Sequence, residues 1–391
     1  MGDAQVVAAT ISQEILTGSF RQGTGLPRIA HPFAASGVLT DVACPSWTAL
    51  IPSAGRIDLD SPAETIDRLT NLDFPMRGAI AALHGEARRI VNAPLCLSAA
   101  REILARVPEG GVVAILTGFP EFPWIRRGVA ETDGPVGAAV LARSLVKARR
   151  AIPILPCEPH FAPVIEAAVR GIGLVPVPAA GLDLKSLHPG DPVCLIEATD
   201  EAVDAERWLA ACAPALVIAI ERPGRSATGV YHNMSGRNVG HCLNNFEDLF
   251  VAAEARGIWT IGIGDGGNEV GMGALQAVVR AQVAAGSACG CGCGGGIAAV
   301  SSSRSLVTAV VANFGATAIA AMLALLTDDR DVLPSPALEL QSLDACVAAG
   351  AVDGQHNECV ASVDGLAADA YGAVLELIAD AVDRARHRRN V

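Results

Sequence analysis

The chain has 391 residues and a net charge of −12, and hydrophobic residues make up 51% of it while aromatic residues make up only 4%. This hydrophobicity excludes a disordered chain, and the acidic balance argues against nucleic acid as a partner, because phosphate backbones bind dense Lys/Arg surfaces. The apolar mass is mainly Ala, Val, Leu and Ile, which is typical of a parallel sheet covered by helices on both faces.

The first part of the chain, residues 1–105, is predicted to be a helical region. Apolar residues recur at helical spacing over 4–17, 61–72, 76–92 and 98–106. The chain opens with an acid at Asp3 where a secretory leader would be basic, and its cysteines are scattered through apolar segments. We therefore expect reduced thiols and a cytoplasmic protein.

The pattern changes at residue 106, where short β-branched runs begin to alternate with helix-length stretches. The predicted strands cover 112–117, 152–156, 174–177, 193–196, 215–220 and 259–263. The predicted helices between them cover 135–149, 161–171, 202–212 and 246–256. Connections of this length join parallel strands, so residues 106–335 are expected to form an α/β catalytic core. Residues 336–391 are expected to be a helical segment packed on that core.

Residues 305–327 carry no charge and are long enough to cross a bilayer. Asn313, Gly315 and many Ala and Thr residues make this segment only moderately hydrophobic, which favours a helix buried inside a large core. We therefore expect no membrane partner.

The loop after the predicted strand 259–263 carries the strongest functional signal. It reads Gly264-Asp265-Gly266-Gly267-Asn268-Glu269. Asp265 and Glu269 are the predicted acid–base pair, with Asn268 beside them. The backbone N–H groups of Gly266 and Gly267 are expected to bind an oxyanion, helped by the N-terminus of a following helix.

The loop also fits two other interpretations. The dinucleotide pattern G-x-G-x-x-G also matches, at Gly262, Gly264 and Gly267. That site needs an acid about 20 residues later, and no Asp or Glu occurs between Glu269 and Asp328. The second interpretation is a tight strand-to-helix turn with an Asn or Asp cap.

Three further segments follow or flank the predicted strands. Glu221, Arg222, Arg225, Asn233 and Arg237 are expected to bind substrate, because arginines clamp carboxylates with paired hydrogen bonds. The alternative is an Arg–Glu pair within a long loop.

Asp133 and Gly134 precede the predicted helix 135–149 and should face the same crevice, unless Asp133 is only a helix cap. The run 289–296 spaces its cysteines by one residue, unlike the two to four of zinc sites, and this favours a flexible glycine loop over a metal site. Arg77 is expected to line the crevice.

These segments resemble the D-glutamate cyclase family. The similar stretches are 262–273, which is long and specific, and 221–225, 233–237, 132–135, 313–316 and 363–366, and they follow the same order along the chain as in the family. The resemblance implies conversion of D-glutamate to 5-oxo-D-proline with loss of water, and it extends the expected substrate-binding set to Asn313. The sequence departs from the family pattern at three positions. Thr228 replaces an expected acidic residue, Ser235 an expected basic residue and Phe314 an expected Trp.

Several alternatives stay open at this point. The enzyme could be a lactam hydrolase, hydro-lyase or racemase acting on another small carboxylic acid, or the chain could bind an anionic metabolite without turnover. No cofactor is certain, but a divalent metal ion on Asp265, Asn268 and Glu269 is possible in principle because carboxylate and amide oxygens are hard ligands. We expect a small carboxylate substrate and a homo-oligomer.

Overall fold

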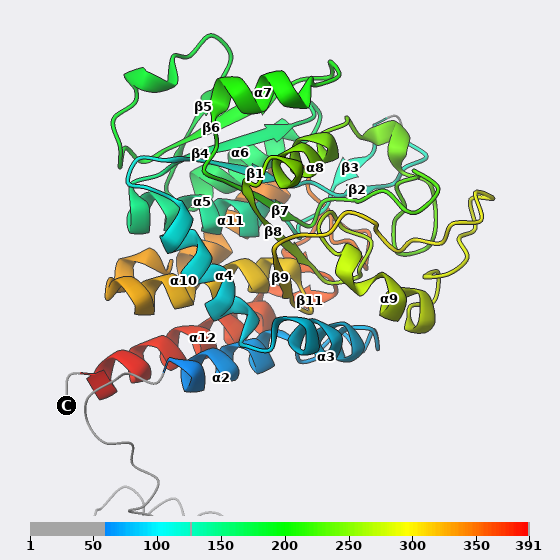
Figure 1. The fold of residues 1–391 in the computed structure, drawn as a ribbon. Helices are drawn as coiled ribbons and strands as arrows, with labels where there is room; N and C mark the ends of the chain where they lie inside the picture. The colour runs from blue at the N-terminus through cyan, green and yellow to red at the C-terminus, as the bar shows by residue number, and fades with distance from the viewer. Residues whose placement is uncertain (1–58, 126, 390–391) are drawn as a thin grey trace, which may run out of the picture. The chain divides into compact units, whose positions relative to one another are not determined.

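The computed structural model describes residues 59–125 and 127–389, and all structural statements below concern these residues. Seven strands form a single parallel sheet in the order β5-β6-β4-β1-β7-β8-β9 (Figure 1). The strands are β1 Val112–Leu116, β4 Ile152–Cys157, β5 Val175–Pro178, β6 Val193–Ala198, β7 Leu216–Ile220, β8 Trp259–Gly264 and β9 Ser305–Thr308. The predicted α/β class is confirmed, and so are all of the strands expected from the sequence.

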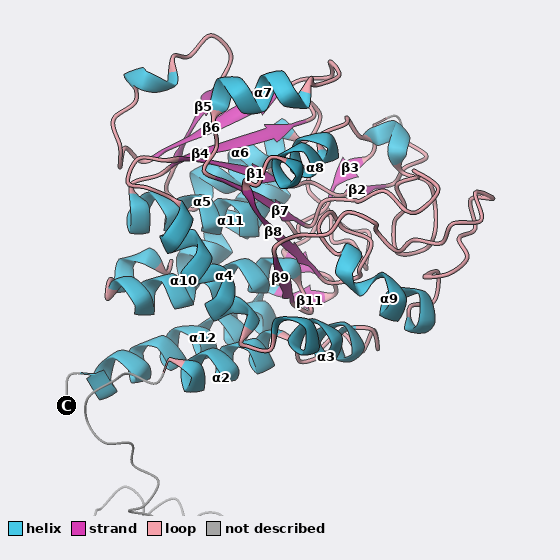
Figure 2. Cartoon of the chain, viewed as in Figure 1, coloured by secondary structure: helices cyan, strands magenta, loops and turns pink. Residues whose placement is uncertain are grey.

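Helices precede, connect and follow these strands (Figure 2). The connecting helices are α5 Pro135–Arg149, α6 Ala162–Gly171, α7 Ala205–Cys212, α8 Glu247–Ala255 and α9 Gln276–Gln282, and α10 Ala312–Thr327 follows the last strand, β9. The flanking ones are α2 Asp60–Thr70, α3 Ile80–Val91, α4 Leu95–Arg106, α11 Pro336–Ala348 and α12 Ala368–Arg389. Two short hairpins pair β2 Pro120–Glu121 with β3 Val129–Ala130 and β10 Ser362–Val363 with β11 Leu366–Ala367. The predicted helix 4–17 lies outside the described residues.

The two faces of the sheet are covered unequally. Successive side chains of a strand point to opposite faces, so Ile218 and Ile220 of β7 join one buried cluster while Val217 and Ala219 join another. The first cluster is the larger and includes buried residues of α2 to α6 and α10 to α12. The second is covered by α7 and α8, which lie together on the other face (Figure 1). The flanking helices therefore share the core of the sheet, and the division at residues 105 and 335 stays a prediction.

The expectation of one helix over 305–327 is wrong in its first part. Ser305–Thr308 is the edge strand β9, which pairs with β8, and the chain turns before α10 begins at Ala312. Both pieces are apolar because β9 lies against the helices and every residue from Ala312 to Leu325 is buried. Across the part of the chain that the structure covers, no helix has the length and hydrophobicity needed to span a bilayer.

Candidate active site

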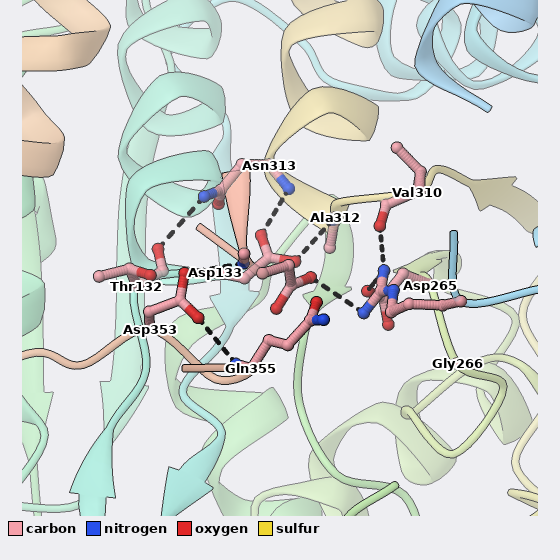
Figure 3. A network of polar contacts seen from close by, with 12 residues as sticks. Thr132, Asp133, Asp265, Gly266, Val310, Ala312, Asn313, Asp353 and Gln355 are labelled. Atoms are coloured by element: carbon pink, nitrogen blue, oxygen red, sulfur yellow. Dashed lines mark hydrogen bonds and ion pairs between the residues drawn. The ribbon is translucent and has the colours of Figure 1, made fainter. Parts of the chain in front are cut away.

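Asp265 directly follows β8, at the carboxyl end of the sheet. Its carboxylate accepts a hydrogen bond from Arg77 Nη2 at 2.6 Å, and Arg77 Nη1 donates to Asp364 at 3.2 Å. Arg77 also donates to the carbonyl oxygen of Val310, which precedes α10 (Figure 3). One guanidinium from the segment before α3 thus links three separate parts of the chain.

Other carboxylates gather around Asp265. We call Asp133, Glu221, Asp265, Glu269 and Asp364 the acidic cluster; all of them are buried. The carboxylate oxygens of Asp133, Asp265 and Asp364 lie within 4.8 Å of one another, and the same holds for Glu221, Asp265 and Glu269. Asp265 belongs to both groups, so it lies at the centre of the cluster.

A cavity of ≈ 310 Å³ opens beside Asp265 and gives solvent a path to it. Arg77, Met234 and Gln282 are among the other residues that line it. A larger cavity of ≈ 760 Å³ lies between the end of α5 and residues 188–192, at the amino ends of the strands. Ligands of open parallel sheets bind at the carboxyl ends, so the smaller cavity is the candidate site.

Burial and mutual repulsion keep protons on part of the acidic cluster. Burial, and then the charge of Asp265, raises the pKa of Asp133 to about 7 and that of Glu269 to about 8. Burial raises the pKa of Glu221 and Asp364 well above the ordinary range, although the Arg77 guanidinium opposes the shift at Asp364. Carboxyl groups that titrate near neutral pH next to Asp265, which lines the cavity, are suited to proton transfer.

Glu269 holds the acidic loop, residues 264–269, in shape. Its Oε1 accepts hydrogen bonds from the backbone N–H groups of Asp265 (3.1 Å) and Gly266 (2.7 Å), and its Oε2 accepts one from Gly267 (2.7 Å). The two glycine N–H groups are therefore occupied by a carboxylate of the same loop, and in this conformation they do not face a substrate oxygen. The expected helix N-terminus is also absent from the loop, because α9 begins only at Gln276.

Asp133 and Asn313 cap each other's helices. The Asp133 carboxylate accepts hydrogen bonds from the backbone N–H groups of Ala312 (2.7 Å) and Asn313 (2.8 Å) at the start of α10. The Asn313 side-chain oxygen accepts hydrogen bonds from the N–H groups of Gly134 (2.9 Å) and Gly137 (2.7 Å) at the start of α5. Asp133 is thus a cap, but of α10 rather than of the α5 helix that follows it.

Two of the expected substrate arginines have carboxylate partners within the protein. Arg222 forms a buried ion pair with Glu158 at 2.6 Å, and Arg225 pairs with Glu247 at 2.8 Å and with Asp248. This is the intramolecular pairing that the sequence left as an alternative. Neither guanidinium lines the cavity beside Asp265.

Three other predicted site residues also have partners within the protein and do not line the cavity: Asn233, Arg237 and Asn268. The Asn233 side-chain oxygen accepts hydrogen bonds from the Ser235 hydroxyl (2.8 Å) and the Arg237 N–H (3.0 Å), which closes a turn. The Arg237 guanidinium lies over the ring of Trp124. Asn268 donates to the carbonyl oxygen of His232 at 2.9 Å.

Backbone strain marks two members of the acidic cluster. Glu221 has φ 41° and Asp364 has φ 50°, a region that non-glycine residues seldom adopt. Glu221 Oε2 is buried and has no hydrogen-bond partner among the described residues. Strain and an unpaired buried oxygen in one cluster indicate a functional site.

The family comparison agrees with this geometry. The model of the family described as D-glutamate cyclase-like, C-terminal, matches residues 66–379. The chain belongs to the D-glutamate cyclase-like family. It is also 29% identical over 242 residues to the protein named D-glutamate cyclase, mitochondrial, from Homo sapiens. That match covers 61% of this chain and 35% of the human protein, so the chain spans about a third of its relative's length.

This D-glutamate cyclase-like chain differs from the expected family pattern at three positions, and none of them lines the cavity. The Thr228 hydroxyl donates to Cys293 Sγ at 3.2 Å, and Ser235 belongs to the Asn233 turn. Phe314 is buried and stacks on Tyr371 with ring centroids 4.6 Å apart. These departures do not alter the described lining of the cavity.

Sequence reasoning assigned no role to Asp364, although it lies in a stretch that resembles the family. An Asp-Gly pair between two short strands was a usable signal, because such pairs mark turns with positive φ. Arg77, expected at the crevice, is present there and turns out to be the cation of the cluster.

Proposed function

We propose that this chain is an enzyme that converts D-glutamate, or a close dicarboxylic amino acid, to 5-oxo-D-proline and water. The observation that carries the proposal is the position of Asp265, at the centre of the acidic cluster and beside a cavity of ≈ 310 Å³. Clustered carboxylates suit a ligand with an ammonium group, because the opposite charge offsets their repulsion.

The reaction needs proton carriers of two kinds. The α-ammonium group must lose protons so that its nitrogen can attack the γ-carboxyl carbon. The C–N bond forms, the C–O bond breaks, and the departing oxygen takes up the protons that the nitrogen lost, leaving as water. A base must therefore lie next to the amine and an acid next to the leaving oxygen.

The acidic cluster supplies groups for both roles. Asp265 lines the cavity and is the proposed base. Asp364 has a strongly raised pKa because it is buried, and it shares Arg77 with Asp265, so it is the proposed acid. Glu269 and Asp133 are then positioning residues, since their oxygens hold the acidic loop and the start of α10.

Arg77 is the proposed partner of the substrate carboxylate that does not react, the α-carboxylate. It is the cationic side chain in the described lining of the cavity, where the substrate would share it with Asp265 and Asp364, whereas Arg222 and Arg225 lie outside that lining. Holding the carboxylate end fixes the amine and the acyl carbon at attack distance, which converts ring closure into a well-oriented intramolecular step.

The test is incubation of the purified chain with D- and L-glutamate, their shorter and longer homologues, and both enantiomers of 5-oxoproline, followed by proton NMR. We expect 5-oxoproline to form from D-glutamate and not from L-glutamate. Thermal stabilisation by these ligands without any product would indicate a binding protein instead. Hydrolysis of 5-oxoproline without ring closure would indicate the lactam hydrolase.

A divalent ion in the acidic cluster is a second version of the same proposal. Both carboxylate groups centred on Asp265 have the spacing to hold a metal ion. Glu269 and Asn268 are weaker candidates than the sequence suggested, because both make hydrogen bonds within the protein. Activity that is lost with chelator and restored by Mg²⁺ or Mn²⁺, but not by Zn²⁺, would support this version. The cytoplasmic location and the homo-oligomer remain predictions.

A further inference from the structure

The cysteine run, residues 289–296, lies in the long connection between α9 and β9 (Figure 1). The structure brings its thiols together with a histidine from a distant part of the chain. The Sγ atoms of Cys289, Cys291 and Cys293 and a ring nitrogen of His232 all lie within 4.8 Å of one another. We propose that these four side chains form a structural site for one Zn²⁺ ion, separate from the acidic cluster.

The distances among the four atoms are close to those of a zinc centre. Cys289 Sγ lies 3.3 Å from Cys291 Sγ and 3.2 Å from Cys293 Sγ. His232 Nε2 lies 3.2 Å from Cys291 Sγ and 3.4 Å from Cys293 Sγ. Tetrahedral zinc with Zn–S bonds of about 2.3 Å holds its sulfur ligands about 3.8 Å apart, so the sulfurs need to separate by only about half an ångström.

The glycines of the run explain how a one-residue spacing can work. Gly292 has φ +86°, so the chain turns sharply between Cys291 and Cys293, and Gly294, with φ +74°, turns it again directly after Cys293. The thiols therefore converge, which an ordinary extended segment with the same spacing would not achieve. A Cβ atom on Gly295 would lie 2.5 Å from Thr228 Oγ1, so glycine also lets the run pack against the segment that carries His232.

The donor set selects the ion. Three thiolates and one imidazole are soft and borderline ligands, which suit Zn²⁺ and not Mg²⁺ or Ca²⁺. Four protein ligands leave no open position for a substrate, which is the arrangement of a structural site. Every cysteine among the described residues is a free thiol, so no disulfide competes for these sulfurs in the structure.

The site would brace the acidic loop from outside. The carbonyl oxygen of His232 accepts the Asn268 side-chain hydrogen bond at 2.9 Å, and the N–H of Ala299, just after the run, donates to the Gly267 carbonyl at 3.1 Å. Fixing His232 to the cysteine run therefore closes a ring of contacts around one wall of the candidate active site.

The first experiment uses the unmodified protein. The full-length chain, purified without metal affinity resin and dialysed against metal-free buffer, is analysed for zinc, iron and copper by mass spectrometry. We expect about one zinc per chain, as for a closed four-ligand site. Protein with Co²⁺ in place of zinc should show the intense visible bands of a tetrahedral ion and the charge-transfer bands of thiolate ligands. Three results would overturn the proposal. They are protein without zinc, protein that holds iron or copper instead of zinc, and a disulfide between two of these cysteines.

The second experiment uses variants. In competition with a chelator, Cys291→Ser and His232→Ala should retain zinc about tenfold or more weakly than the wild type. The matched control is Cys359→Ser, which removes an exposed thiol that bonds to the Val347 carbonyl, far in sequence from the run. Asp265→Asn should also retain zinc, because its carboxylate belongs to the other group. Equal retention by all four variants would overturn the assignment of the ligands.

Discussion

Two glycine-rich segments border the candidate active site, and they satisfy their polar groups in opposite ways. In the acidic loop, the backbone N–H groups of Gly266 and Gly267 donate to the carboxyl group of Glu269, so the loop supplies its own hydrogen-bond acceptor. In the cysteine run, three thiols and His232 come together, and these are the groups that we assign to one Zn²⁺ ion. The glycine N–H groups of the first segment thus have an acceptor within the segment, and Asp265 is its residue that we assign to catalysis. The second segment, on our proposal, takes its ligand from outside the chain.

Removing the carboxylate that we assign to chemistry should have the largest effect. Asp265→Asn should lower turnover of D-glutamate by about 10²- to 10⁴-fold, the usual contribution of a general base, because the amide cannot accept the ammonium proton. The measurement is initial rate by NMR, with folding checked by circular dichroism. Asp383→Asn is the matched control, since Asp383 also pairs with an arginine (Arg330, 2.8 Å) but on the surface. Unchanged turnover in Asp265→Asn would exclude this residue from the reaction.

The same loop should respond differently when its scaffold is removed. Glu269→Ala leaves three buried N–H groups without an acceptor, so we expect the free energy of unfolding to fall by about 3 kcal/mol. Urea denaturation measures this change. Glu166→Ala, which removes an exposed ion pair with Arg170 within α6, should cost less than about 0.5 kcal/mol. If Glu269→Ala were as stable as this control, Glu269 would not be the support of the loop.

How much of this could the sequence predict? The strands and the connecting helices follow from periodicity, and α5 begins and ends at the predicted residues. The edge strand β9 was missed because an apolar strand followed directly by a buried helix has the composition of one longer helix. The position of Asp265 followed from a general rule, since loops after parallel strands meet at one edge of the sheet.

The partners of the predicted residues could not be obtained in the same way. Arg222 pairs with Glu158 and Asp133 caps α10, and both contacts join residues far apart in sequence that no local pattern connects. The cysteine run was interpreted as a flexible loop because the spacing rule compares neighbours only. His232, which completes the group of ligands, carries no signal by itself.

The acidic cluster and the cysteine run should also respond to pH with opposite signs. Burial raises the pKa of Asp133 from 3.8 to about 7, so between these values the folded protein holds a proton that the unfolded chain has lost. Its contribution to stability is complete below about pH 4 and is lost as the pH rises through 7, by roughly 1.4 kcal/mol per pH unit. Zinc binding instead strengthens with pH, because the thiols must lose their protons.

Urea unfolding from pH 5 to pH 8 in metal-free buffer tests the pH dependence of stability that we expect from Asp133. We expect stability to fall with rising pH, and Asp133→Asn to flatten the slope. Zinc retention by the cysteine run, measured over the same pH range, should rise with pH. A stability that increases with pH in the metal-free protein would contradict the raised pKa of Asp133.

The smallest expected effect separates backbone strain from packing in the cysteine run. A Cβ atom added at Gly290 or at Gly292 meets no atom within 4 Å, but only Gly292 has a positive φ (+86°). Gly292→Ala should therefore destabilise the zinc-loaded protein by about 1 kcal/mol, whereas Gly290→Ala should be close to neutral. Thermal unfolding of the two variants side by side measures the difference. Equal behaviour would mean that the turn at Gly292 is not what brings the thiols together, and the convergence of Cys291 and Cys293 would need another cause.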